Sequence, residues 1–134
     1  MPKIENCSRA DIKNGTHGKV TPNTILIQIS DVGYEQPKPL MYFRRSFPFW
    51  FDDVNENETN FLNDTSSIVI AKLLRSAYKN DYDIIVHCHA GLCRSGAVVE
   101  AALHIGFNPV VSRYRYPNSD ITVKLLKTLE TIRE

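Results

Sequence analysis

The segment DIIVHCHAGLCRSGAVVEAALHIG, from Asp83 to Gly106, constrains the fold of this chain more than any other part of the sequence. It opens with a short apolar run, which is typical of a strand buried on both faces of a parallel sheet. A helical pattern then begins near Arg94 and ends at Gly106, a residue type that often follows a helix. A buried strand that leads directly into a helix is the repeating unit of α/β proteins, so the segment predicts an α/β fold.

The rest of the chain supplies further elements of such a fold. Residues 24 to 30 are rich in β-branched side chains and predict a strand, and residues 40 to 51 predict one or two short strands interrupted near Pro48. Residues 65 to 79 and a segment after Asn118 carry the apolar spacing of amphipathic helices. We therefore predict an α/β three-layer sandwich with a small central, mostly parallel sheet flanked by helices.

Length and composition narrow the kind of protein. A chain of 134 residues, 43% of them apolar, suffices for one domain over residues 1–134, in which the polar residues 1–23 predict an irregular N-terminal arm. The net charge of +1 favours neither a nucleic acid nor a membrane as partner. Three cysteines are an odd number, and the N-terminus lacks the apolar core of a signal peptide, so we expect a cytoplasmic protein with reduced thiols. We also expect a monomer.

The connection between the predicted strand and the helix at Arg94 is suited to hold an anion. A helix start offers unpaired backbone N–H groups and the positive end of the helix dipole. Gly91 can adopt a positive φ, which lets successive N–H groups point inward, and Arg94 adds a planar fork that matches two phosphate oxygens. The predicted phosphate-binding residues are His89, Ala90, Gly91, Leu92, Cys93 and Arg94.

Cys88 precedes this loop, where it would serve as a nucleophile. The donors that hold a phosphate also stabilise a thiolate, which makes the thiol reactive at neutral pH. Cys88 would attack phosphorus and form a cysteinyl-phosphate that water then cleaves. Ser95 could donate a hydrogen bond to the sulfur when it leaves. We expect phosphate, sulfate or vanadate to bind in the loop, with no metal and no cofactor.

The sequence HCHAGLCRS resembles the active-site loop of the protein tyrosine phosphatase superfamily, His-Cys-x-x-Gly-x-x-Arg-Ser/Thr. The matched positions are His87, Cys88, Gly91, Arg94 and Ser95. The resemblance runs from about residue 24 to residue 134, and the modest length resembles the small dual-specificity branch or its compact bacterial and phage relatives. It implies hydrolysis of phosphotyrosine, and of phosphoserine or phosphothreonine, in a phosphorylated protein or peptide.

The resemblance also implies a general acid upstream, for which Asp52 and Asp53 are the candidates. The stretch WFD at residues 50 to 52 resembles a Trp-Pro-Asp motif with phenylalanine in place of proline. The stretch FDDV at residues 51 to 54 resembles the Phe-x-Asp-Ile/Val form of small relatives, which favours Asp53. Asn118, in a Pro-Asn pair before the last helix, resembles a residue that braces the phosphate loop, but a plain N-cap would explain it without that role. His87 is expected to fix the loop by hydrogen bonding.

Four other interpretations compete with this one. A zinc site would draw on His87, Cys88, His89, Cys93 and His104, but consecutive residues that leave a strand project alternately, which disfavours convergence on a metal. RNA 5′-phosphatases and lipid phosphatases share the signature, although the near-neutral charge disfavours the nucleic-acid version. A catalytically silent phosphate-binding module would keep the loop without turnover. Oxidation could also link Cys88 and Cys93 in a reversible disulfide.

Overall fold

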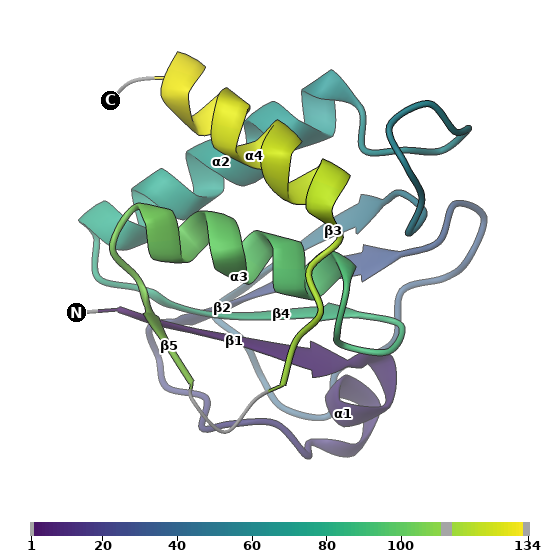
Figure 1. Ribbon diagram of the computed structural model, residues 1–134. Helices are drawn as coiled ribbons and strands as arrows, with labels where there is room; N and C mark the ends of the chain where they lie inside the picture. Colours follow the sequence, from purple (N-terminus) through teal and green to yellow (C-terminus); the bar gives the residue numbers. More distant parts are fainter. Residues whose placement is uncertain (1, 111–113, 133–134) are drawn as a thin grey trace.

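The computed structural model describes residues 2–110 and 114–132, which form a five-stranded sheet with helices on both faces (Figure 1). In chain order the elements are β1 (Lys3–Ser8), α1 (Arg9–Asn14), β2 (Thr24–Ser30), β3 (Arg45–Trp50), α2 (Asp64–Lys79), β4 (Asp83–Cys88), α3 (Arg94–His104), β5 (Asn108–Pro109) and α4 (Ser119–Thr131). The strand order is β3-β2-β4-β1-β5, and each neighbouring pair is parallel. The predicted α/β class with a mostly parallel sheet is confirmed.

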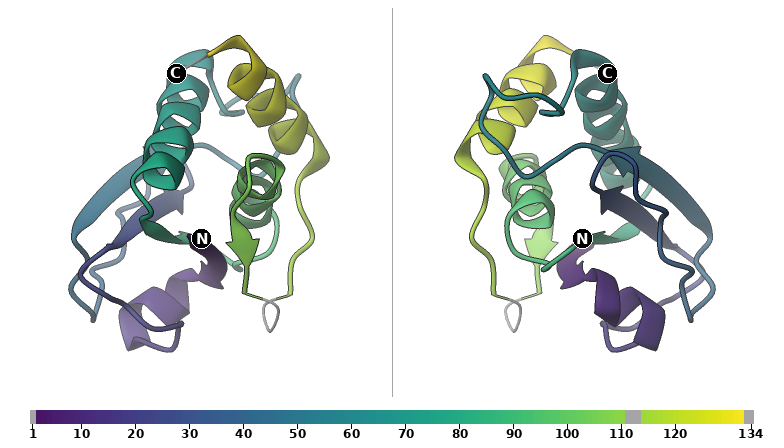
Figure 2. Two further views of the ribbon diagram at one scale, coloured as in Figure 1. Left: turned by 90° about the vertical axis from the view of Figure 1, so that its left-hand side faces the viewer. Right: turned by 90° about the vertical axis from the view of Figure 1, so that its right-hand side faces the viewer.

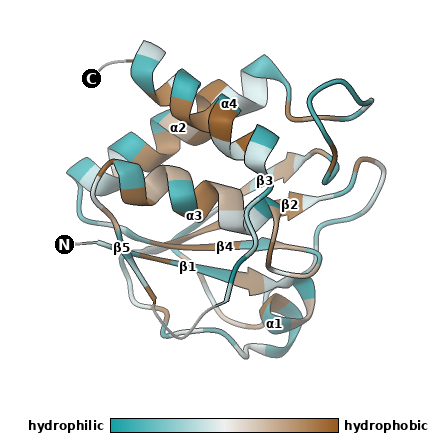
Figure 3. Cartoon of the chain, in the orientation of Figure 1, coloured by the Kyte–Doolittle hydropathy of each residue, from teal (hydrophilic) through white to brown (hydrophobic). Residues whose placement is uncertain are grey.

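The helices cover the two faces of the sheet unequally. The helices α2, α3 and α4 lie on one face, and the short α1 lies on the other, against β1 and β4 (Figures 1 and 2). Alternation along β2 serves both faces, because Ile25, Ile27 and Ile29 join the large core while Leu26 joins a smaller one under α1. In Figure 3 β4, in the middle of the sheet, carries mostly apolar colour, whereas the long loop before α2 is mostly hydrophilic.

The N-terminal segment is not the irregular arm that the sequence predicts. Residues Lys3–Ser8 form β1, which lies between β4 and β5 inside the sheet. The helix α1 follows at once, and a capping box defines its start: the Ser8 hydroxyl accepts from the Asp11 N–H, and the Asp11 carboxylate accepts from the Ser8 N–H.

The prediction failed because β1 buries polar side chains whose partners lie far away in the sequence. Glu5 and Asn6 are both buried. The Glu5 carboxylate accepts from the Gly18 N–H at 2.9 Å, and the Asn6 amide donates to the carbonyls of Gly91 and Tyr114 at 2.7 Å each. A buried polar group is stable when it is hydrogen-bonded. The polar residues of Lys3–Ser8 therefore occur in a buried strand, although their polarity does not predict one.

The other predicted elements differ only in detail. Residues Arg45–Trp50 form a single strand, and Pro48 lies within it, because β3 is at the edge of the sheet, where a missing N–H leaves no ladder bond unmade. The helix α2 starts one residue earlier than predicted, after Asn63, whose side chain accepts from the Ser66 N–H at 2.8 Å. Among the described residues, no helix has the length and apolar character needed to cross a membrane.

Parallel pairing brings the carboxyl ends of β1 to β4 to one edge of the sheet. The segments that leave these four strands begin at Arg9, Asp31, Phe51 and His89. In open parallel sheets ligands bind at this edge, where loops from several strands meet. The segment HCHAGLCRS therefore lies beside the start of α1 and the loops that follow β2 and β3, which the sequence alone does not bring together.

Candidate active site

The loop between β4 and α3 forms a cradle at this edge of the sheet. Cys88 is the last residue of β4 and is 2% exposed, and Arg94 is the first residue of α3 and is 5% exposed. The Cys88 sulfur lies 3.1 Å from the hydroxyl oxygen of Ser95. A buried thiol thus lies beside a hydroxyl that can donate to it, at the start of a helix.

The backbone polar groups of the loop are oriented in two directions. Within the described part of the chain, none of the backbone N–H groups of residues 89 to 94 donates a hydrogen bond. The carbonyl groups of the same loop instead accept from groups outside it, at 2.7 to 3.1 Å, donated by Asn6, Arg9, Tyr116 and Asn118. Backbone donors are almost always paired in a folded protein, so a run of unpaired ones forms a ready site for several acceptor oxygens.

Gly91 is required in this loop for two separate reasons. Its φ of +77° lies in the left-handed region that side chains disfavour. A Cβ added there would lie 2.5 Å from the Cys7 carbonyl carbon and 2.6 Å from the Ser8 nitrogen. The loop therefore packs directly on the backbone of β1, and only a residue without a side chain permits that approach.

Arg94 is held in place from two neighbouring loops. Its Nη1 donates to Asp31 Oδ1 at 2.5 Å and to the Phe51 carbonyl at 2.9 Å. Its Nε is buried and has no hydrogen-bond partner. An unsatisfied buried donor is costly, and an oxygen of a bound oxyanion would satisfy it. Asp31 thus orients the guanidinium while a charged donor stays available.

The adjacent residues Asp52 and Asp53 have different surroundings. Both Asp52 oxygens accept within the surrounding loops, from the Val32 N–H at 3.0 Å and from the Asn60 amide at 3.2 Å. Asp53 is exposed, and its Oδ1 accepts from the Asn118 side-chain amide at 2.8 Å. Asp52 therefore serves the local fold, while Asp53 lies at the rim of the cradle.

Asn118 connects three parts of the site. Its Oδ1 accepts from the Ile121 N–H at 3.1 Å, which makes it the N-cap of α4. Its backbone N–H donates to the Cys93 carbonyl at 3.0 Å, and its side-chain amide donates to Asp53. Contact with the phosphate loop is thus made by the backbone of Asn118, and its side chain positions Asp53 instead.

Cys93 and His87 have shifted protonation equilibria. Burial, together with the charge and hydrogen bond of Asp53, raises the pKa of the Cys93 thiol, so this thiol stays protonated at neutral pH. Burial also lowers the pKa of His87 to about 4; an interaction with the Cys88 backbone opposes this shift, and the charges of Arg9 and Arg94 add to it. Neither ring nitrogen of His87 has a partner at hydrogen-bonding geometry among the described residues. His87 is therefore a buried neutral ring at the end of β4, and the role of fixing the loop by hydrogen bonding stays a prediction.

The remaining candidate residues are His89, the cysteines and the possible metal ligands. His89 is exposed at the mouth of the loop, and the three cysteines, Cys7, Cys88 and Cys93, are not joined in disulfides. Within residues 2–110 and 114–132, no three His, Cys, Asp or Glu side chains come together as metal ligands.

Sequence reasoning missed Asn6 and Asp31. The sequence could have indicated Asp31, because it directly follows the strand predicted at residues 24 to 30, and ligand-binding residues of parallel sheets lie at the ends of strands. Cys88 likewise comes after the apolar run that begins at Asp83. Nothing in the sequence indicated Asn6, since its segment showed no strand pattern. Both were missed because their partners lie more than sixty residues away along the chain.

Comparison with known proteins relates the chain to solved structures. No family model matches the sequence, and no curated protein matches it. The structure is similar to that of human DUSP28, with 16% identity and a TM-score of 0.63 over 98% of this chain and 94% of that one.

Two further solved structures are similar. One is a mouse putative dual specificity phosphatase complexed with zinc tungstate, with 21% identity and a TM-score of 0.55 over 81% of this chain and 70% of that one. The other is OH1 from the Orf virus, described as a tyrosine phosphatase, with 19% identity and a TM-score of 0.52 over 99% of this chain and 72% of that one. The chain therefore has the fold of the dual-specificity and tyrosine phosphatases, as its resemblance to that superfamily implies.

Proposed function

We propose that this protein is a cysteine-dependent phosphatase that hydrolyses phosphotyrosine, and also phosphoserine or phosphothreonine, in proteins. One observation carries the proposal: the unpaired backbone N–H groups of residues 89 to 94 follow directly on the buried Cys88, and the unpartnered Nε of Arg94 lies at the end of the same loop. Such an array of donors suits a tetrahedral oxyanion, and it also stabilises a thiolate.

In the first chemical step the Cys88 thiolate attacks phosphorus and the bond from phosphorus to the leaving oxygen breaks. The backbone N–H groups and Arg94 hold the three other oxygens, where negative charge is concentrated. The leaving oxygen takes a proton from the Asp53 carboxyl group, which is exposed at the rim. The Asn118 amide holds Asp53 through one oxygen, so Asn118 is a positioning residue.

In the second step water attacks the cysteinyl-phosphate and the bond from sulfur to phosphorus breaks. Asp53, now ionised, accepts the proton of the water. The sulfur departs as a thiolate, and the Ser95 hydroxyl at 3.1 Å donates a hydrogen bond to it. Asp52 is less suited to either transfer, because both of its carboxylate oxygens accept from groups of the surrounding loops, whereas Asp53 is exposed beside the phosphate loop.

The test is turnover of p-nitrophenyl phosphate and of a phosphotyrosine peptide, each with and without EDTA. We expect turnover that EDTA does not affect, and we expect Cys88→Ser to abolish it. Cys7→Ser is the matched control, because this other buried cysteine lies in the small core under α1. Activity that survives Cys88→Ser would overturn the mechanism.

The substrate class is tested separately, with a phosphotyrosine peptide, a 5′-triphosphorylated oligonucleotide and a phosphoinositide. We expect the peptide to be preferred. Preference for either other substrate would keep the chemistry and replace the substrate. Phosphate binding without turnover of any substrate would identify a silent binding module.

A further inference from the structure

A small cavity of about 230 Å³ opens beside the phosphate loop. Its lining consists of Arg9, Ile29, Ser30, Asp31, Tyr34 and His89. His89 belongs to the phosphate loop, and Asp31 is the carboxylate that orients Arg94. The cavity therefore adjoins the cradle. A substrate whose phosphate is bound in the cradle could extend a neighbouring group into the cavity.

Arg9 is anchored next to the nucleophile by its backbone. Ser8 and Cys88 are register partners in neighbouring parallel strands, which lie about 4.8 Å apart. The Arg9 N–H donates to the His89 carbonyl at 3.1 Å. These contacts fix the Arg9 backbone independently of its side chain, and the side chain lines the cavity beside the loop.

The charge of Arg9 is not compensated. Its Nη1 makes one long hydrogen bond, 3.4 Å, to the Ser30 hydroxyl oxygen. Within the part of the chain that the structure describes, no carboxylate pairs with the Arg9 guanidinium. Asp31, the one carboxylate in the same cavity, is already paired with Arg94. A half-buried cation without a counterion favours an anionic ligand.

We propose that this cavity binds an acidic side chain of the substrate, a carboxylate or a second phosphate next to the phosphotyrosine, through Arg9. The inference rests on the proposed function. The volume is below the roughly 300 Å³ at which small-molecule pockets begin, which suits a single side chain. Tyr34, which is 65% exposed, provides the apolar surface for its aliphatic part.

The charges around the cradle are distributed so that the acidic side chain has a preferred direction. The loop after β3 exposes Asp53, Glu56 and Glu58, whereas Arg9 follows β1, and these two strands lie on opposite sides of β4. An acidic residue on the Arg9 side is attracted, and one on the side of the loop after β3 is repelled. Only one flank of the phosphotyrosine should therefore favour an acid.

The experiment compares kcat/KM for phosphotyrosine peptides that carry Ala, Glu, phosphoserine or Lys on either flank. Mass spectrometry follows the loss of each phosphate. For the wild type we expect Glu and phosphoserine to exceed Ala by about tenfold on one flank only, the size of a charge-assisted hydrogen bond. Arg9→Gln should remove this preference, and Arg9→Glu should reverse it in favour of Lys. The control Arg45→Ala, an exposed arginine at the start of β3, should keep it.

Each outcome distinguishes this inference from the proposed function. Equal turnover of all peptides by the wild type, or an acidic preference that survives in both folded Arg9 variants, would overturn the inference and leave the phosphatase proposal intact. A preference for the 5′-triphosphorylated oligonucleotide that depends on Arg9 would also overturn it, because the cavity would then serve a nucleotide. Failure to hydrolyse any phosphotyrosine substrate would overturn the proposed function itself.

Discussion

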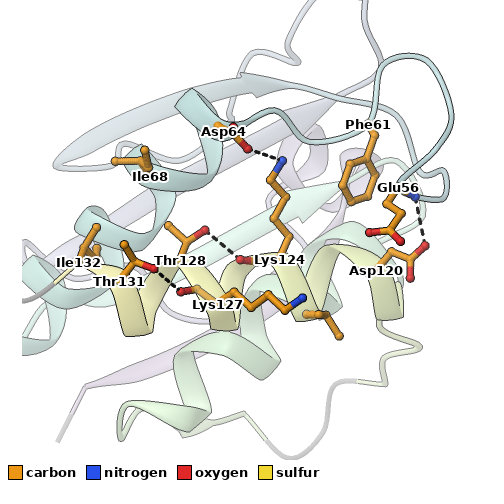
Figure 4. A pocket seen from close by; sticks show the side chains of 11 residues that line it. Glu56, Phe61, Asp64, Ile68, Asp120, Lys124, Lys127, Thr128, Thr131 and Ile132 are labelled. Atoms are coloured by element: carbon orange, nitrogen blue, oxygen red, sulfur yellow. Dashed lines mark hydrogen bonds and ion pairs between the residues drawn. The ribbon is translucent and has the colours of Figure 1, made fainter.

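The cradle at the carboxyl edge of the sheet contrasts with a groove between α2 and α4. The groove has a volume of about 720 Å³, which far exceeds the 230 Å³ of the cavity beside the cradle. Its polar groups bond to one another: Lys124 pairs with Asp64 at 2.8 Å, and Asp120 accepts from the Glu56 N–H at 3.1 Å (Figure 4). In the cradle, by contrast, backbone donors and the Arg94 Nε have no partner.

The volume of a cavity in this molecule therefore does not indicate where unpaired hydrogen-bond donors lie. A folded chain pairs its polar groups wherever it can, and the groove follows that rule at its two charged contacts. Unpaired donors near a buried thiol lower the stability of the fold unless a bound ligand accepts hydrogen bonds from them. Variants at the two places should therefore have effects of very different size.

The largest effect is expected for Arg94→Lys. Lysine keeps the charge but lacks the planar fork, so it cannot hold Asp31, the Phe51 carbonyl and an oxyanion together. We expect kcat to fall by about 10³-fold, as for loss of an oxyanion donor. Steady-state kinetics with p-nitrophenyl phosphate checks this, and Lys124→Arg in the groove is the matched exchange. A loss below tenfold would remove Arg94 from the chemistry.

The next effect separates the two adjacent aspartates. Asp53→Asn should lower kcat on a phosphotyrosine peptide by about 10²-fold, because the leaving oxygen loses its proton donor. A general acid works in its protonated form, so this variant should also lose the limb of the pH profile along which activity falls as pH rises. Asp52→Asn should keep that limb. The reverse result would assign the acid to Asp52.

A third prediction concerns stability and the buried His87. Its pKa is about 4 in the folded protein, against 6.5 in a free side chain, so only the unfolded chain takes up a proton as the pH falls between these values. The stabilisation is complete above pH 6.5 and is lost as the pH falls toward 4. It amounts to about 3 kcal/mol in the free energy of unfolding.

The variant His87→Asn should lack this component. Urea unfolding at pH 7 and at pH 4 gives the decrease in the free energy of unfolding for each protein. The component is the amount by which this decrease is larger for the wild type than for the variant. Equal losses for the two proteins would mean that the ring takes up its proton without unfolding, which contradicts its neutral burial under the loop.

The smallest effect is expected in the groove. The hydrogen bond and charge of Lys124 lower the pKa of Asp64, but this carboxylate is exposed, and solvent screens such pairs. Asp64→Asn should leave both kcat/KM and the midpoint of thermal unfolding close to the wild-type values. A large loss of activity would show that the groove and the cradle are coupled.

Much of the candidate site could be predicted because its signals are local. The segment from Asp83 to Gly106 encodes a strand, a loop and a helix within one short stretch, and the spacing of Cys88 and Arg94 follows from that geometry alone. The sequence predicts that Gly91 adopts a positive φ, which the structure confirms. The structure also shows that the loop packs so closely on β1 at this position that no side chain fits.

The distant residues that surround this loop, by contrast, are brought to it by the tertiary fold. This fold inserted a polar-looking N-terminal strand into the sheet, brought Asn6 and Asp31 to the cradle, and gave Asp52 and Asp53 different partners. The α/β class and the succession of buried strand, thiol, loop and helix could be read from the sequence, because they depend on neighbours along the chain. The partners depend on parallel strand order, which no local pattern encodes, and on burial, which pairs polar groups across long separations.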